Sequence, residues 1–185
     1  MKIGCVVMAA GNSVRFGSNK LLCRIDGYSM IQRALSVIPT EQLYGVTVVT
    51  QYDEIAKLAD ECGFQSVKNL HPEWGISYTI SLGIKSMLWA DAAIFLVADQ
   101  PLLKKSSVAA LISTYLSQPD RIAALSYNGK RGNPCLFPAE FFPELLALHG
   151  DVGGSAVIHA HTDKLLLVEA DNAELQDVDT PQQLP

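Results

Sequence analysis

Short runs of apolar residues alternate along the chain with longer segments in which apolar residues recur every three or four positions. The short runs predict strands, and those at residues 3–9 and 92–98 are nearly continuous in apolar residues, as strands buried on both faces are. The longer segments predict amphipathic helices. Strands are expected at residues 3–9, 45–50, 64–67, 92–98, 122–127 and 165–170, and helices at residues 29–37, 53–61, 76–89, 106–116 and 140–148.

This alternation predicts βαβ units, and therefore a Rossmann-like three-layer α/β fold with a mostly parallel central sheet. No repeat, low-complexity tract or linker divides the sequence, so residues 1–185 are expected to form one domain. The loop-rich stretch is residues 128–138. Ligands of open parallel sheets bind beyond the carboxyl ends of the strands, so the residues that follow strands are the candidates for function.

Composition narrows the class of protein. The 185 residues are 49% hydrophobic and 18% charged with a net charge of −5, which fits a folded soluble domain and argues against binding nucleic acid or an anionic membrane through bulk charge. No apolar run approaches the roughly 20 residues that cross a bilayer, and no export signal is visible. A cytoplasmic protein is expected, with Cys5, Cys23, Cys62 and Cys135 reduced and mostly buried.

The charges are unevenly distributed. Residues 1–33 hold five basic side chains against Asp26, which predicts a local anion site near the N-terminus. The segment after the first strand, residues 10–20, contains small residues together with Arg15 and Lys20. Small residues let backbone N–H groups approach a phosphate, and the two cations neutralise its charge.

This loop is neither of two common phosphate motifs. It lacks Gly-x-Gly-x-x-Gly, and Gly11 to Gly17 is one residue too long for a P-loop, so a dehydrogenase or P-loop kinase is not predicted. The alternative to an anion-binding loop is a loop without a binding function, in which Arg15 and Lys20 are only solvated.

A carboxylate follows the other nearly continuous apolar strand. Asp99 comes directly after residues 92–98. If this strand is parallel to the first, Asp99 lies at the same edge of the sheet as residues 10–20, which we call the glycine loop. A carboxylate beside a triphosphate is what Mg²⁺ requires. The alternative is a turn residue before Pro101, or a cap of the next helix.

Two motifs carry a family resemblance. Ala-Ala-Gly-x-Ser-x-Arg-x-Gly-x-x-Lys-Leu at residues 9–21 resembles the signature of the nucleotidyltransferases that activate molybdenum cofactor, in particular their molybdopterin cytidylyltransferase branch. Val-Ala-Asp-Gln-Pro at residues 97–101 resembles the Ala-Asp-x-Pro element of that family. The resemblance implies a nucleotide-binding set of Ala9, Ala10, Gly11, Arg15, Gly17 and Lys20, and a catalytic set of Lys20, Arg15 and Asp99, with Asp99 as a metal ligand.

Looser elements extend the resemblance along the chain. Residues 69–83 resemble the stretch that helps to hold the nucleoside, which adds Asn69, Ser77 and Thr79, although these hydroxyls are also suited to capping a helix. Residues 132–137 and 150–155 resemble two elements that flank the acceptor site. They add Asn133, Pro134 and Asp151 as acceptor-binding residues. Asn133 stands where histidine is usual and Ser155 where arginine is usual.

The last element is Asp-x-Asp-Thr-Pro at residues 177–181, which makes Asp179 a second candidate metal ligand. Thr180, Pro181 and Gln183 also form the pattern of a capped helix start. His159 and His161 would share a face of a strand, but their segment is typical of a helix, so no metal site is predicted there. No serine or cysteine has the neighbours of a hydrolase triad.

The resemblance implies a reaction in which the terminal phosphate of a pterin attacks the α-phosphorus of CTP, with Mg²⁺ bound and pyrophosphate leaving. It also implies a molybdenum hydroxylase as the client of the product. A guanylyltransferase stays open, although Ala10 stands where that branch has glycine. A sugar-phosphate or alcohol-phosphate nucleotidyltransferase and a non-catalytic, nucleotide-binding maturation factor also stay open.

Overall fold

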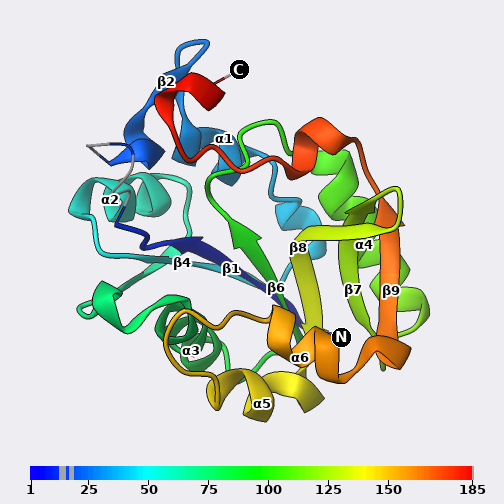
Figure 1. The fold of residues 1–185 in the computed structure, drawn as a ribbon. Coiled ribbons are helices and arrows are strands. Elements are labelled where there is room, and N and C mark those ends of the chain that lie inside the picture. Colours follow the sequence, from blue (N-terminus) through cyan, green and yellow to red (C-terminus); the bar gives the residue numbers. More distant parts are fainter. Residues whose placement is uncertain (13–15, 17–18, 185) are drawn as a thin grey trace.

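A seven-stranded sheet forms the middle layer of a three-layer α/β fold in the computed structural model, which describes residues 1–12, 16 and 19–184 (Figure 1). The strands of this sheet are β1 (Ile3–Ala9), β4 (Gly45–Thr50), β5 (Gln65–Lys68), β6 (Ala92–Val97), β7 (Ile122–Tyr127), β8 (Lys130–Pro138) and β9 (Leu165–Glu169). Their order is β5-β4-β1-β6-β8-β7-β9, and only β8 runs antiparallel to its neighbours. The predicted mostly parallel sheet is confirmed.

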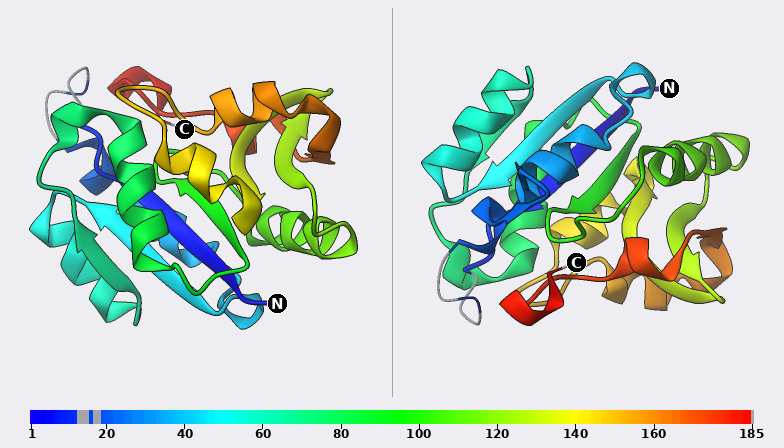
Figure 2. Two further views of the ribbon diagram at one scale, coloured as in Figure 1. Left: turned by 90° about the horizontal axis from the view of Figure 1, so that it is seen from below. Right: turned by 90° about the horizontal axis from the view of Figure 1, so that it is seen from above.

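Helices cover both faces of the sheet, as the two views of Figure 2 show. They are α1 (Met30–Ser36), α2 (Asp53–Glu61), α3 (Ile76–Ser86), α4 (Lys105–Ser117), α5 (Phe142–Leu146) and α6 (Ser155–Ala160). Short 3-10 helices lie at Lys20–Leu22, Thr40–Gln42, Pro72–Trp74, Ala139–Phe141, Thr162–Lys164, Asn172–Leu175 and Pro181–Gln183, and a small hairpin joins β2 (Arg24–Ile25) to β3 (Tyr28–Ser29).

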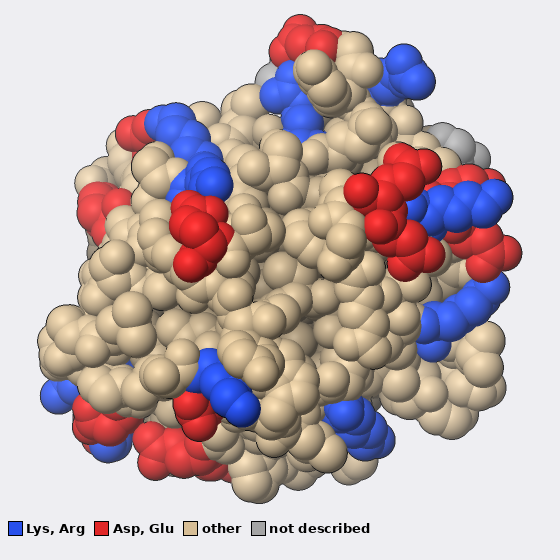
Figure 3. Space-filling model, turned by 180° about the vertical axis from the view of Figure 1, so that it is seen from behind, with Lys and Arg blue, Asp and Glu red and all other residues tan. Residues whose placement is uncertain are grey.

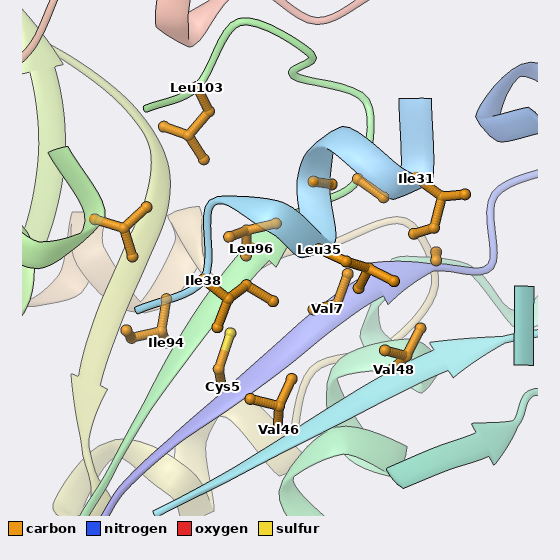
Figure 4. Close-up of a cluster of buried hydrophobic side chains, with 14 of the residues drawn as sticks. Cys5, Val7, Ile31, Leu35, Ile38, Val46, Val48, Ile94, Leu96 and Leu103 are labelled. Carbon is orange, nitrogen blue, oxygen red and sulfur yellow. The ribbon is translucent and has the colours of Figure 1, made fainter. Parts of the chain in front are cut away.

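The alternation of side chains along the strands gives the sheet two apolar faces. Cys5 and Val7 of β1 point to the face that α1, α2 and α4 cover, whereas Val6 points to the face that α3, α5 and α6 cover. In Figure 4, Ile31 and Leu35 of α1 pack over the first of these faces. Burial on both faces explains why β1 and β6 are apolar throughout.

The main departure from prediction is β8. Residues 128–138 were expected to be a loop because of their Gly, Asn and Pro residues, but Lys130–Pro138 form a strand between β6 and β7. Pairing to a strand on each side overrides the local turn signals. The β7–β8 pairing is irregular where those turn-forming residues lie, with a shift in register between Ala124 and Ser126 of β7. All four cysteines are free, but only Cys5 and Cys135 are buried.

No helix in the described part of the chain is long and apolar enough to cross a membrane. On the face turned away from the viewer in Figure 1, basic and acidic side chains of the described residues lie intermixed rather than in a basic patch (Figure 3).

Candidate active site

A cleft of about 380 Å³ lies at the carboxyl ends of β1 and β6. These strands are parallel neighbours, with Met8 paired to Val97, so the segments that follow them leave the same edge of the sheet. This is the edge at which open α/β sheets bind ligands. The cleft is lined by Met8, Ala10, Gly11, Asn12, Lys20, Leu21, Pro72, Gly75, Ile76, Thr79, Val97, Ala98, Asp99, Asp151 and Asp179.

Three predicted site residues meet at one point of this cleft. Lys20 Nζ donates hydrogen bonds to Asp99 Oδ2 at 2.7 Å and to Asp179 Oδ1 at 3.0 Å. The three residues come from the start, the middle and the end of the sequence. Only 12% of the Lys20 side chain is exposed, so its charge interacts with both carboxylates in a partly dehydrated setting.

The electrostatics of this cluster follow from its geometry. Burial disfavours the charged form of Lys20, but the Asp99 carboxylate, followed by Asp179, holds the pKa of Lys20 above its ordinary value. Asp177 lies close by, and its pKa is raised by partial burial and by the negative charges of Asp99 and Asp179. The cluster therefore contains a cation that is firmly protonated at neutral pH.

The C-terminal segment is fixed against the end of β6. The Val178 N–H donates to the Asp99 carbonyl at 2.9 Å. The Asp179 and Thr180 N–H groups donate to Gln183 Oε1, which forms the predicted capping box before the 3-10 helix at Pro181–Gln183. The capping interpretation of this motif is confirmed, and the cap fixes the backbone of Asp179, whose carboxylate reaches Lys20 in the cleft.

The start of the glycine loop is held by Thr50, the last residue of β4, and by the two residues that follow it. Thr50 Oγ1, Gln51 Nε2 and the Tyr52 hydroxyl donate to the carbonyls of Ala9, Ala10 and Gly11, respectively. Ala10 and Gly11 line the cleft, whereas Ala9 is buried beneath it. Arg15 and Gly17 lie outside the described residues.

Of the expected nucleoside-binding residues, Thr79 of α3 reaches the cleft. Asn69 is 2% exposed and does not line the cleft; its Nδ2 donates to Thr79 Oγ1 at 3.1 Å, and its Oδ1 accepts from the His71 N–H. Ser77 is also buried and lies on a separate surface groove beside Trp74. Asn69 thus positions a cleft residue through a hydrogen bond.

Two of the three expected acceptor-binding residues line a cavity, and each lines a different one. Asp151 lines the main cleft, because its loop packs directly on Gly75. A Cβ on Gly75 would lie 2.4 Å from the carbonyl of Gly150, and Gly75 has a φ of +84°, so glycine is required at this position. Asn133 lines a smaller cavity of about 90 Å³, and Pro134 is buried in β8 after a cis peptide bond.

The histidine pair has no metal-binding geometry. His159 lies in α6, as the helical pattern predicts, and His161 follows the end of that helix with its Nε2 2.9 Å from Glu144 Oε1. Among the described residues, no group of three or more His, Cys, Asp or Glu side chains is arranged to hold a metal alone.

Sequence reasoning missed two residues near the site. Gln100 is buried, and its Nε2 donates to Asp177 Oδ1, which ties the segment after β6 to the C-terminal segment. Arg131 of β8 lines the smaller cavity. The Lys-Arg pair that precedes Gly-Asn-Pro is a visible signal in the sequence, but the Gly, Asn and Pro residues around it predict a loop.

These features match a known family. A family model described as a MobA-like NTP transferase domain matches residues 5–165, which include the glycine loop, Asp99 and Asp151. The chain belongs to the MobA-like NTP transferase family. The purine catabolism protein PucB of Bacillus subtilis (strain 168) is 29% identical over 191 residues, which cover 96% of this chain and 92% of PucB.

Solved structures share the fold of this MobA-like transferase. A nucleotidyl transferase from Methanothermobacter thermautotrophicus (Mth528) superposes with a TM-score of 0.82 at 18% identity, covering 98% of this chain and 93% of that one. Rv0371c from Mycobacterium tuberculosis H37Rv in complex with manganese superposes with a TM-score of 0.71 at 20% identity, covering 92% of this chain and 90% of that one. CMP:2-keto-3-deoxy-manno-octonic acid synthetase in complex with CTP superposes with a TM-score of 0.76 at 16% identity, covering 98% of this chain and 95% of that one.

Proposed function

We propose that this transferase moves CMP from CTP to the terminal phosphate of a phosphorylated pterin, molybdopterin, and releases pyrophosphate. The observation that carries the proposal is the convergence of Lys20, Asp99 and Asp179 on the cleft that the glycine loop borders. Phosphoryl transfer needs a cation that can bind phosphate oxygens and carboxylates that can bind a metal ion. Lys20 is suited to the first task, and Asp99 and Asp179 are suited to the second.

The residues present fit a hard divalent cation such as Mg²⁺. Asp99 and Asp179 already converge on one positively charged atom, so a cation is accommodated between them. Two carboxylates without further protein ligands suit Mg²⁺, which takes one or two carboxylates and completes its shell with water and phosphate oxygens. Bound there, Mg²⁺ would neutralise charge on the phosphates. The manganese complex of Rv0371c, a protein of the same fold, is consistent with this assignment.

The protein contributes orientation and charge. Lys20 would release the two carboxylates and bind phosphate oxygens, where it offsets the charge that grows as pyrophosphate leaves. Backbone N–H groups of the glycine loop, with Arg15, would hold the triphosphate. A phosphate monoester is an anion near pH 7, so the attacking group needs no protein base.

The choice of CTP is supported by Ala10. This residue is 5% exposed and borders the cleft, so its methyl group narrows the space for a base where the guanylyltransferase branch has glycine. A misfit of about one methyl group changes kcat/KM by roughly 10–200-fold. The complex of a synthetase of the same fold with CTP is consistent with this choice.

We infer that residues 1–185 work as one unit in which the N-terminal half binds the nucleotide and the C-terminal half binds the acceptor. Lys20 and Ala10 come from the first part, and Asp151 and Asn133 from the second. Delivery of the product to a molybdenum hydroxylase is the corresponding cellular role.

The test is pyrophosphate release from CTP or GTP with Mg²⁺ and a series of acceptors. We expect release to require molybdopterin and CTP, with GTP about 10–200-fold poorer in kcat/KM. Release with a sugar phosphate or alcohol phosphate only would move the chain to those transferases, and nucleotide binding without release with any acceptor would favour a maturation factor.

A further inference from the structure

Arg131 stands apart from the cations of the nucleotide end. It is half-buried on β8, where its Nη2 donates to Ser155 Oγ at 2.9 Å and its Nη1 lies 3.6 Å from Cys135 Sγ. Both partners are neutral. Within the described part of the chain, its guanidinium forms no ion pair with a carboxylate.

Arg131 lines a small cavity. Arg131, Asn133 and Ser155 form the polar part of the wall of the 90 Å³ cavity, and the rest is mainly apolar, with Phe95, Phe137 and Leu145 among its residues. A volume of this size holds a few water molecules or one small polar group. It is too small for a fused ring system, so it suits one functional group of a larger ligand.

This cavity adjoins the nucleotide cleft. Met8, Ile76 and Val97 line both spaces, so the two share a wall at the ends of β1 and β6. A ligand group at Arg131 therefore belongs to a molecule that reaches toward the cleft from the side of β8 and α6.

A partly buried cation without a counter-ion favours an anionic ligand. The cavity wall is largely apolar, with Phe137 and Leu145 in it, and an apolar wall lowers the local dielectric constant and so strengthens attraction to an oxyanion. The planar guanidinium can bind two oxygens of such a group at once. Ser155 adds a hydroxyl beside the guanidinium, so a second polar group is available to the same oxyanion.

We propose that Arg131, with Ser155, forms the subsite for an anionic oxygen-bearing group of the acceptor, of the phosphate monoester class. The inference rests on the proposed function, since it assigns a residue to the acceptor of that reaction. It gives Arg131 a role that neither the motifs nor the family match supplied.

The test uses inorganic phosphate as the probe. Phosphate is titrated into ¹⁵N-labelled protein while the Arg131 Nε–Hε signal and the Ser155 amide signal are followed. We expect saturable shifts of both signals in the wild-type protein. In Arg131→Gln the shift of the Ser155 amide should need about tenfold more phosphate or more, because one charged hydrogen-bonding partner is lost. Arg131→Lys should fall between the two.

Arg121 provides the matched control, since its Nη1 donates to the Asp163 carbonyl away from both cavities. Arg121→Gln should bind phosphate as the wild type does. Thermal melting of each variant confirms that it is folded. Phosphate shifts confined to the glycine loop, or equal phosphate affinity in Arg131→Gln and the wild type, would overturn the proposal.

A parallel titration with CTP separates this inference from the proposed function. Arg131→Gln should bind CTP within about threefold of the wild type, since the two spaces hold different groups. A loss of CTP binding that matches the loss of phosphate binding would place Arg131 at the nucleotide and contradict the subsite. Failure of the wild type to bind CTP would contradict the proposed function. The phosphate titration would still test the subsite, because it follows the Arg131 and Ser155 signals without CTP.

Discussion

The two ends of the active-site region hold their cations differently. At the end proposed to bind the nucleotide, Lys20 is paired with Asp99 and Asp179, whereas at the end proposed to bind the acceptor Arg131 is bonded to the neutral groups of Ser155 and Cys135. A paired cation must exchange partners when phosphate binds. An unpaired cation is ready for its ligand and loses no ion pair on binding it.

The same contrast applies to how each end is built. Lys20, Asp99 and Asp179 come from distant parts of the chain and are joined by charge. The loop at Asp151, by contrast, is held by close backbone packing of Gly150 on Gly75. We therefore expect substitutions of charge to act on turnover and metal binding at the first end, and substitutions of shape to act on stability at the second.

The largest effect is expected for Asp99→Asn, which removes a carboxylate charge but keeps the side-chain shape. Turnover should fall by about 10³-fold, because preorganised charge at the transferring phosphate is lost. Activity and thermal melting are measured together. Asp91→Asn is the control, because Asp91 precedes β6 at the opposite edge of the sheet and accepts from the Lys2 N–H. Activity that persists in Asp99→Asn across a magnesium titration would make Asp99 a turn residue.

Lys20→Ala should lower turnover at saturating CTP by about 10²-fold or more, because one charged contact to the phosphates is lost. Lys57→Ala, which alters an exposed lysine on α2, should leave turnover unchanged. If Arg15 acts on the same step, the double variant Arg15→Ala/Lys20→Ala should lose less than the product of the two single losses. Turnover of Lys20→Ala close to that of the wild type would remove Lys20 from the mechanism.

How far the sequence predicted this arrangement depended on whether a signal was local. Short, mainly apolar runs are a local signal, so the expected bounds of β1, β4 and β7 agree with the structure. The parallel pairing of β1 with β6 then placed Asp99 beside the glycine loop. Strand pairing across the sheet leaves no such local signal, which is why β8 was expected to be a loop and Arg131 was missed.

The sequence predicted which residues belong to the candidate site, but not which of them contact one another. The motifs indicated Lys20, Asp99 and Asp179 separately, but nothing in the sequence showed that Lys20 bonds to both carboxylates. The capping pattern at Thr180 was local enough to predict, yet its effect on the position of Asp179 depends on the contact of Val178 with Asp99.

Metal binding should respond to the same pairing. In Lys20→Gln the affinity for Mn²⁺ without nucleotide should rise by about tenfold, because the competing ammonium group is removed from two carboxylates. Electron paramagnetic resonance of free Mn²⁺ measures this without any reaction. Lys57→Gln serves as the control, and an equal or weaker affinity in Lys20→Gln would show that Lys20 does not occupy the place of the metal.

The smallest effect concerns the acceptor end. Gly75→Ala should lower the free energy of unfolding by about 1–3 kcal/mol, because its Cβ would overlap the Gly150 carbonyl and its φ is positive. Gly63→Ala has a similar φ of +74° but open space around the Cβ, so it measures the backbone cost alone. Urea denaturation compares the two. Equal losses would mean that the Gly150 loop moves away freely and is not fixed by Gly75.

The central claim is that the nucleotide loses pyrophosphate and its nucleotidyl group joins the acceptor. Two reactions with molybdopterin and Mg²⁺ decide it, one with CTP radiolabelled at the α-phosphorus and one with CTP radiolabelled at the γ-phosphorus. The account predicts the α label in the acceptor product and the γ label in pyrophosphate. Transfer of the γ label to the acceptor would make the protein a kinase, and its release as inorganic phosphate would make it a phosphatase; either result contradicts the account.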